Sequence, residues 1–294
     1  MNSKSFCSSV VAPLLLLLLA NVAAAQQPWF FVVMSDPQFG MYAKDQNFKQ
    51  ETANFEFAIA NVNRLHPRFV VICGDLVNKS GDADEIAEYK RVLKQLDPSI
   101  PVYSVAGNHD IGNEPTPASI EAFRKNIGRD YYTFSTDEML GIVLDSNLIR
   151  SPEHVTEAAK EQEGWLKKTL SEAKANGRQQ VVVFQHIPFF IKDPNEADEY
   201  FNIPQATRRR YLDLLEQSGV RYVFAGHYHR NAGGTDGPLT EIVTGAVGMP
   251  LGGSLSGFRS VTVRGNKLES TWFCLGGIPN VVDPEHPAST PCQQ

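Results

Sequence analysis

The sequence predicts a mixed α/β fold, and three observations support this prediction. Short runs rich in Val, Ile and Phe alternate with amphipathic helical stretches over the first two thirds of the chain. Five apolar runs end in side chains of the kinds that bind metal ions. These segments extend from Asp36 to His229 with no linker-like stretch between them, so one domain must contain them all.

Strands and helices are expected to alternate in the first part of the chain. The apolar run Trp29–Met34 predicts a strand, and residues 51–65 then repeat apolar side chains such as Phe55 and Ile59 on one helical face. The same patterns predict a strand at 69–73, a helix at 83–96 that ends before Pro98, and a strand at 102–106.

The pattern changes in the later part of the chain. Strands are expected at 131–135, 141–144, 180–184 and 220–225, with helices near 160–175 and 205–217. Strands and Gly-rich turns follow, at 239–243, 260–263 and 268–273, and two packed sheets flanked by helices would fit this order. Residues 277–294, which hold four prolines, are predicted to form an irregular tail.

Residues 1–25 have the features of a secretory signal peptide. Lys4 provides a basic start, residues 10–20 an apolar core, and Ala23-Ala24-Ala25 a small-residue cleavage site. No later stretch approaches the ~20 apolar residues that a transmembrane helix needs. We therefore expect a secreted or periplasmic protein with no stable membrane anchor and a folded domain at 26–276. An uncleaved N-terminal anchor is the alternative.

The charge and the cysteines limit the partners and the compartment. A net charge of −6 argues against nucleic acid as the main partner, but not against a phosphorylated substrate, because bound metal ions supply local positive charge. Cys73 lies in an apolar strand and is predicted to be a small buried hydrophobe. Cys274 and Cys292 lie near the C terminus of a chain expected in an oxidising compartment, and the sequence leaves open whether they pair.

The metal-type side chains are grouped in short motifs, each just after a predicted strand. The motifs are Ser35-Asp36-Pro37-Gln38, Gly74-Asp75, Gly107-Asn108-His109-Asp110, Gln185-His186 and Gly226-His227-Tyr228-His229. Carboxylate, amide and imidazole groups together suit Mn, Fe, Zn or similar divalent ions. Because such motifs meet at the carboxyl edge of an open α/β sheet, we expect a single centre there. The glycines that precede ligands suit backbone that turns sharply and approaches an ion closely.

The order of these motifs resembles that of the calcineurin-like metallophosphoesterases: Asp-x-His, Gly-Asp, Gly-Asn-His, a lone His, and Gly-His-x-His. The resemblance covers residues 29–276, nearly the whole mature chain. It implies a four-layer α/β/β/α sandwich and a metal-dependent phosphoric ester hydrolase that holds two divalent ions, Mn, Fe, Zn or Mg. The string Ser-Asp-Pro-Gln-Phe-Gly at 35–40 resembles a subfamily described as serine/threonine phosphatases.

The resemblance also implies a role for each motif residue. One metal ion would take Asp36, Asp75 and His229, and the other would take Asp75, Asn108, His186 and His227, so that Asp75 bridges the two. His109 is the expected catalytic residue, as proton donor to the leaving oxygen or as a stabiliser of phosphoryl charge. Asn78 and Asp110 are expected to support the site from behind the ligands.

Two positions depart from the family pattern. Gln38 stands where the family most often has the His of Asp-x-His, so the first metal ion loses an imidazole and gains at most a neutral amide oxygen. This favours a harder ion such as Mg or Mn. Asn78 stands where the protein-phosphatase branch often has an Asp that orients the catalytic His, and an amide stabilises the imidazolium less.

The leading hypothesis is hydrolysis of phosphomonoesters, on a small molecule or a protein, by two-metal activation of water. The first alternative is a phosphodiesterase that acts on cyclic nucleotides or glycerophosphodiesters, since the same metals serve both reactions and the pocket walls decide. The second is a non-catalytic metal- or phosphate-binding protein in which Gln38 has emptied one metal site. An adhesion module has little support, because the sequence holds no repeats.

The pocket walls are expected to come from residues 41–48, 147–154 and 187–201. The aromatic side chains of the last segment either line the pocket or pack in the core: Phe189, Phe190, Tyr200 and Phe201. The basic run Arg208-Arg209-Arg210 is interpreted as a solvated helix face.

Overall fold

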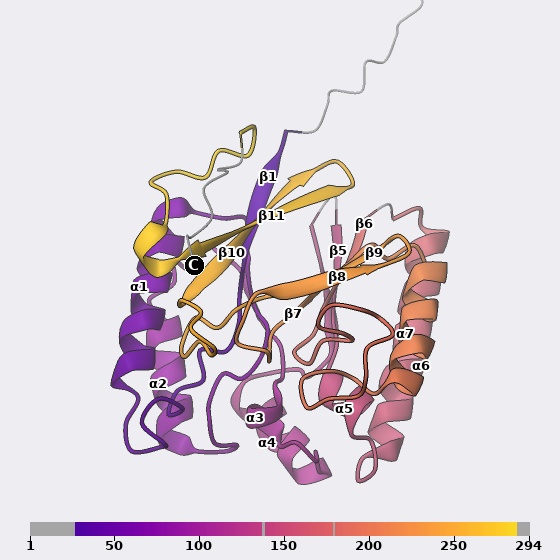
Figure 1. Ribbon diagram of the computed structural model, residues 1–294, viewed down its shortest axis with the longest axis horizontal. Coiled ribbons are helices and arrows are strands. Elements are labelled where there is room, and N and C mark those ends of the chain that lie inside the picture. The colour runs from indigo at the N-terminus through magenta and orange to yellow at the C-terminus, as the bar shows by residue number, and fades with distance from the viewer. Residues whose placement is uncertain (1–26, 137–138, 179, 287–294) are drawn as a thin grey trace, which may run out of the picture.

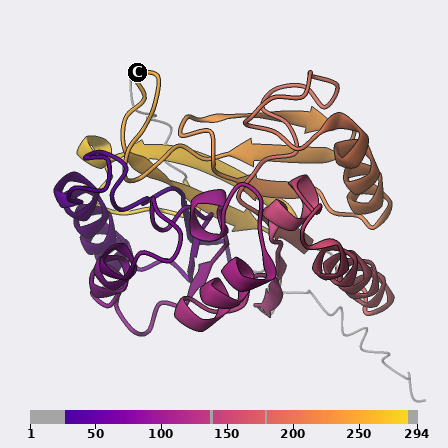
Figure 2. The ribbon, with the colours of Figure 1, turned by 90° about the horizontal axis from the view of Figure 1, so that it is seen from below.

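The computed structural model describes residues 27–136, 139–178 and 180–286, and it contains two β-sheets packed face to face between two layers of helices. Figure 1 shows α1 and α2 on one outer side and α6 and α7 on the other, and Figure 2 shows the same layers from below. The mixed α/β sandwich predicted from the sequence is therefore confirmed.

Both sheets are mixed: the first has antiparallel strands at one edge only, and the second has an antiparallel strand at each edge. The first, in the order β11-β10-β1-β2-β3, contains β1 (Trp29–Met34), β2 (Val70–Ile72), β3 (Val102–Ser104), β10 (Gly257–Arg264) and β11 (Lys267–Cys274). The second, in the order β4-β5-β6-β7-β9-β8, contains β4 (Tyr132–Ser135), β5 (Met139–Val143), β6 (Gln180–Phe184), β7 (Tyr222–Ala225), β8 (Ala232–Asp236) and β9 (Leu239–Val243). Strands β1, β2 and β3 run parallel, as do β5, β6, β7 and β9.

The helices cover the outer faces of the sheets and the edge where the site lies. They are α1 (Lys49–Leu65), α2 (Ala83–Leu93), α3 (Asn108–Ile111), α4 (Pro117–Asn126), α5 (Ser146–Arg150), α6 (Thr156–Ala175), α7 (Gln205–Gln217) and the 3-10 turn η1 (Leu275–Gly277). Local sequence sets several of their ends. The Asp82 carboxylate accepts hydrogen bonds from two backbone N–H groups of α2, and Thr116 caps α4 directly before Pro117.

Strand alternation produces three separate cores. On β1, Phe30, Val32 and Met34 pack with the α1 and α2 side, whereas Trp29, Phe31 and Val33 face the second sheet. Phe31 lies between the sheets, with its ring centroid 6.0 Å from that of Phe184 and 5.9 Å from that of Phe224. A third cluster joins the second sheet to α6 and α7. Both strands and helices are thus buried against fixed partners, which gives the ligand loops a rigid support.

The expected elements match the observed ones closely, with a few differences. The helix expected at 83–96 ends at Leu93, and the sequence patterns missed α3, α4, α5 and β8. These elements are short, or, in the case of β8, built from Ala, Gly, Thr and Asp without an apolar alternation, so neither periodicity was visible. The expected irregular tail follows η1, and the structure describes it only as far as residue 286.

The predicted signal peptide and Cys292 lie outside the described residues. Cys274 is disulfide-bonded, and Cys73 is free and buried, as predicted for it. In the residues that the structure describes, no helix is both long and apolar enough to cross a membrane.

Candidate metal centre

The predicted ligands come together at the carboxyl ends of five parallel strands. Asp36 and Asp75 follow β1 and β2, Asn108 begins α3 just after β3, and His186 and His227 follow β6 and β7. All of these side chains, and His229, are buried. The two sheets therefore contribute to a single cluster that forms between their adjacent edges.

The backbone at this edge is held in an uncommon conformation. Of eight non-Gly residues with positive φ in the described chain, five are predicted ligands: Asp36, Gln38, Asp75, His227 and His229, with φ between 36° and 65°. Left-handed φ in L-residues stores strain and is concentrated at functional sites. The surrounding sheets have to maintain these turns, which aim side chains inward directly after each strand.

Glycine is required at two of these turns by close approach of other groups. A Cβ on Gly107 would lie 2.1 Å from the backbone nitrogen of Asp75, and one on Gly226 would lie 1.7 Å from Oγ of Ser35. Both contacts are far below van der Waals distance. Gly107 therefore allows the loops after β2 and β3 to pack directly on one another, and Gly226 allows the loop after β7 to pack on the loop after β1 in the other sheet.

The first group of possible ligands contains Asp36, Asp75 and His229. Nδ1 of His229 lies 2.6 Å from the Met249 carbonyl oxygen, which only accepts, so Nδ1 donates and Nε2 presents a lone pair. This Nε2 lies 3.2 Å from Oδ1 of Asp36, which is another acceptor. Two facing acceptors need a cation between them, either a proton on the ring or a metal ion.

Gln38 adds an oxygen to this neighbourhood. Its Oε1 and Oδ1 of Asp36 are both enclosed, and neither has a hydrogen-bond partner within the described part of the chain. Unsatisfied buried oxygens are rare and need an explanation, such as a role in binding a metal ion. The donor set therefore fits a divalent cation that prefers oxygen ligands at this position.

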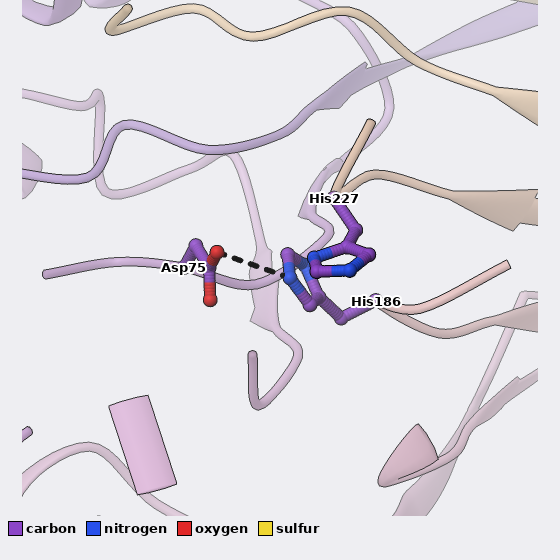
Figure 3. Close-up of side chains that lie close together, drawn as sticks. All are labelled: Asp75, His186 and His227. Atoms are coloured by element: carbon purple, nitrogen blue, oxygen red, sulfur yellow. Dashed lines mark ion pairs between the residues drawn. The ribbon is translucent and has the colours of Figure 1, made fainter. Parts of the chain in front are cut away.

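The second group contains Asp75, His186 and His227, which Figure 3 shows side by side. His186 Nδ1 donates to the Cys73 carbonyl oxygen at 2.7 Å, so its Nε2 is again the lone-pair nitrogen. Nε2 lies 3.1 Å from Oδ2 of Asp75 and 3.0 Å from Oδ1 of Asn108. Three acceptors therefore converge on one point. His227 donates from Nε2 to the Tyr200 carbonyl oxygen at 3.2 Å, which leaves Nδ1 for an ion.

The pKa shifts reflect this crowding of acceptors. Burial works to lower the pKa of His186, but the charge and hydrogen bond of Asp75 outweigh it and raise the pKa to about 9. Burial, together with the neighbouring His186, lowers the pKa of His227 to about 3. When no metal ion is bound, the raised pKa favours a proton on His186 that balances the charge of Asp75. A bound metal ion would take over that role and release the proton.

His109 lies next to the ligands without belonging to either group. Its backbone N–H donates to Oδ1 of Asp75 at 2.8 Å, and its Nδ1 donates to the Asn78 carbonyl oxygen at 2.6 Å. Unlike the buried ligands, His109 is partly exposed. Its Nε2 is therefore left free to exchange a proton with a substrate.

Asn78 and Asp110 support the loop behind the site, in different ways. The backbone carbonyl of Asn78, not its side chain, holds His109, whereas its side-chain oxygen accepts a hydrogen bond of 3.0 Å from Nε2 of Gln38. The orienting role that the sequence assigned to the Asn78 amide is therefore wrong in this structure. Asp110 accepts three backbone hydrogen bonds, from Leu76, Val77 and Gly107, and fixes the loop that carries Asp75.

The expected pocket-wall aromatic residues divide into two pairs. Phe189 and Phe190 are fully buried in the core beneath the second sheet. Tyr200 is 47% exposed and its ring centroid lies 5.0 Å from that of His227, while Phe201 lies 5.6 Å from His227. The second pair alone contributes to the wall of the metal centre.

The segment that carries this wall is anchored by two buried ionisable side chains that the sequence did not reveal. Arg208 is fully buried and donates to the carbonyl oxygens of Ile203, Pro194 and Glu196, so its interpretation as part of a solvated helix face is wrong. Arg209 and Arg210 do pair with acidic side chains on the surface. Buried Glu241 accepts the backbone N–H groups of two consecutive residues where the segment begins.

Comparison with known proteins identifies relatives along most of the chain. The model of the calcineurin-like phosphoesterase family matches residues 31–231. The serine/threonine-protein phosphatase CPPED1 of Homo sapiens is 37% identical over 264 residues, covering 84% of this chain and 84% of its own. The protein of that name from Danio rerio is 36% identical over 263 residues, covering 84% of this chain and 85% of its own.

Solved structures share the fold at much lower identity. A dimetal phosphatase from Danio rerio superposes with a TM-score of 0.60 at 17% identity, over 84% of this chain and 96% of the other. GAP50, described as the anchor in the inner membrane complex of Plasmodium, superposes with a TM-score of 0.63 at 14% identity, over 86% of this chain and 87% of the other. These matches extend the fold similarity and nothing more.

Proposed function

The chain belongs to the calcineurin-like phosphoesterases, metal-dependent phosphoric ester hydrolases, and from this premise we propose that it hydrolyses phosphomonoesters with two divalent metal ions at this centre. The observation that carries the proposal is the convergence of metal-type ligand atoms: Nε2 of His186 lies against Asp75 and Asn108, and Nε2 of His229 lies against Asp36. Asp75 belongs to both groups and would be the residue that two bound ions share.

The chain's own residues prepare the reaction around the metal ions. When bound, two such ions polarise the phosphoryl oxygens and lower the pKa of the attacking water. His109 is held through Nδ1 by a backbone carbonyl, so its Nε2 delivers a proton to the leaving oxygen and afterwards carries the lone pair. Oδ1 of Asp75 fixes the backbone of His109 beside the ligands. This hydrogen bond keeps His109 in a fixed position relative to the metal ligands.

The names of the relatives and the exposure of residues at the site support a substrate class. The curated relatives are named serine/threonine-protein phosphatases, which supports a phosphoserine or phosphothreonine monoester as substrate. His109 and Tyr200 lie at the exposed side of the centre, as a macromolecular substrate requires. A small phosphomonoester remains the reference substrate for testing the chemistry.

The test is metal-dependent hydrolysis by the mature protein. The protein is stripped of metal, Mn, Fe, Zn, Mg or Ca is added back singly, and bound metal is counted while an aryl phosphomonoester and the matching diester are assayed. We expect two bound ions and faster hydrolysis of the monoester. Faster hydrolysis of the diester would instead assign a phosphodiesterase. One tightly bound ion without turnover would assign a non-catalytic binding protein.

We also propose that the protein is secreted or periplasmic. The signal-peptide features of residues 1–25 and the disulfide-bonded Cys274 support this, because structural disulfides persist in oxidising compartments. N-terminal sequencing of protein from the medium or periplasm should find Gln26 first. Retention in the cytoplasm with Met1 intact would contradict the proposal.

A further inference from the structure

Two arginines beside the metal centre have no hydrogen-bond or ion-pair partner for their guanidinium groups within the described residues. Arg150 ends α5, and Arg230 directly follows His229. Both are partly buried, and the enclosed Nε of each is unsatisfied. Other arginines of the chain, such as Arg91 and Arg124, are paired with carboxylates. A partly buried guanidinium without an anion is unfavourable and calls for an anionic ligand.

Both guanidinium groups lie against the aromatic side chains that line the centre. We call Tyr200, Phe201 and Tyr228 the aromatic wall. The Arg150 Cζ lies 5.5 Å from the ring centroid of Tyr200, and the Arg230 Cζ lies 4.1 Å from that of Tyr228 and 6.0 Å from that of Phe201. Cation–π contact of this kind holds a guanidinium plane in place while its N–H groups stay available.

The aromatic wall connects each arginine to the metal ligand His227 through ring contacts. Tyr200 and Phe201 pack edge to face with centroids 5.1 Å apart, and both lie against His227. Arg150 contacts the ring of Tyr200, and Arg230 contacts the ring of Phe201. Each cation is therefore linked to His227 through one aromatic ring, which places both beside the centre. A substrate whose phosphate is held by the metal ligands would present a neighbouring group to them.

We propose that Arg150 and Arg230 bind a second anionic group of the substrate, next to the phosphate that is hydrolysed. The inference rests on the proposed function, and it adds a preference for phosphoesters that carry a further carboxylate or phosphate nearby. Arginine binds either group through paired N–H donors. In a peptide substrate, the group is an acidic side chain or a second phosphorylated residue that flanks the phosphoserine.

The experiment compares peptides that differ only in the residues beside one phosphoserine. The flanking residues are Asn, Asp or a second phosphoserine, and kcat/KM is measured on metal-loaded protein. For wild type we expect kcat/KM to be about tenfold higher on the Asp and second-phosphoserine peptides than on the Asn peptide. This factor is the range of one charge-assisted hydrogen bond. The Asp and phosphoserine peptides show which anion the arginines prefer.

The variants Arg150→Gln and Arg230→Gln should each lower that preference, and the double variant should remove it. Arg221→Gln is the matched control, because Arg221 is exposed at the amino end of β7, away from the centre, and should keep the wild-type ratio. Bound metal and the thermal midpoint of unfolding verify that each variant is folded. Arg150→Lys, which keeps the charge, should recover part of the preference.

Three results would overturn the inference. An equal loss of kcat/KM on neutral and acidic peptides would assign the arginines to the scissile phosphate itself. A wild-type ratio near one would show that no second anion is bound. If no peptide is hydrolysed, the proposed function fails, and fluorescence anisotropy of the labelled peptides on the metal-loaded protein then decides: equal Kd values for the Asn and Asp peptides overturn the inference, and tighter binding of the Asp peptide by wild type alone supports it.

Discussion

The side-chain nitrogen of Gln38 donates a hydrogen bond of 3.0 Å to the side-chain oxygen of Asn78, and this contact sets the roles of both residues. It leaves the enclosed Oε1 of Gln38 without a hydrogen-bond partner among the described residues, two positions along the chain from Asp36, whose buried Oδ1 lies 3.2 Å from Nε2 of His229. It also occupies the Asn78 amide, so His109 is held by a backbone carbonyl. The departure from Asp-x-His therefore replaces an imidazole by an amide oxygen whose orientation is fixed.

The first prediction concerns Gln38 as an oxygen ligand. Gln38→Leu should lower the bound metal from two ions to one, because it removes that oxygen, and Gln38→His should shift the preference from Mg or Mn toward Zn. Bound metal counted after dialysis against each ion measures both effects. Gln180→Leu is the control, since Gln180 is a buried glutamine with no side-chain partner at the opposite end of β6. Two ions in Gln38→Leu would show that Oε1 is not a ligand.

Sequence patterns predicted the mixed α/β class and the convergence of the motifs at one centre, from periodicity and from the rule that motifs after parallel strands converge. The four-layer order and the role of each ligand were implied by the resemblance to the family. The patterns could not show the left-handed backbone at Asp36 or His229, because φ depends on tertiary packing. Nor could they show that Tyr200 contributes a carbonyl to His227 or that Arg208 is buried, since both depend on how a long loop folds back.

The second prediction separates metal binding from proton transfer. His109→Ala should keep the wild-type metal content and lower kcat about 10²- to 10⁴-fold, the range of a general acid. The loss should be smaller for esters with acidic leaving groups, which need little protonation. Kinetics with a series of aryl phosphates measures this dependence. A kcat loss that is equal for every leaving group would exclude the role of proton donor.

The third prediction follows from the backbone contact of His109. Asn78→Ala keeps the carbonyl that holds His109 but removes the hydrogen bond to Gln38. We expect weaker metal binding, by about 10- to 100-fold as for other residues that orient a ligand, and a kcat near wild type at saturating metal. Titration of kcat with Mn measures both quantities. A low kcat at saturating metal would mean that the side chain orients His109 after all.

The fourth prediction concerns Asp75, which belongs to both ligand groups and holds the backbone of His109. Asp75→Asn keeps the size of the side chain but removes the shared negative charge. Metal content and turnover should therefore be lost together, to the background of the assay. Asp84→Asn, on the exposed first turn of α2, is a charge-matched control that should change neither. Normal turnover by Asp75→Asn would refute the bridging role.

The last prediction is a pH dependence of stability that arises from Glu241. Burial raises the pKa of Glu241 to about 8, although two backbone N–H groups and Arg208 favour the charged form. The unfolded chain releases this proton near pH 4.5, so between about pH 4.5 and 8 the folded state binds more protons than the unfolded state. The free energy of unfolding that Glu241 contributes must therefore fall as the pH rises through this window.

Glu241→Gln removes the titration, and its side chain still accepts one of the two backbone hydrogen bonds. Relative to wild type, the variant should be destabilised by about 1–3 kcal/mol at low pH, the effect of one lost buried hydrogen bond. As the pH rises to about 8, the free energy of unfolding of the variant should increase relative to that of wild type, and above about pH 8 the difference should stay constant. Urea unfolding of both proteins at several pH values measures the difference, from which any pH-dependent loss of metal common to both cancels. A difference that stays constant from pH 5 to pH 8 would show that Glu241 is ionised throughout and that its two N–H donors outweigh its burial.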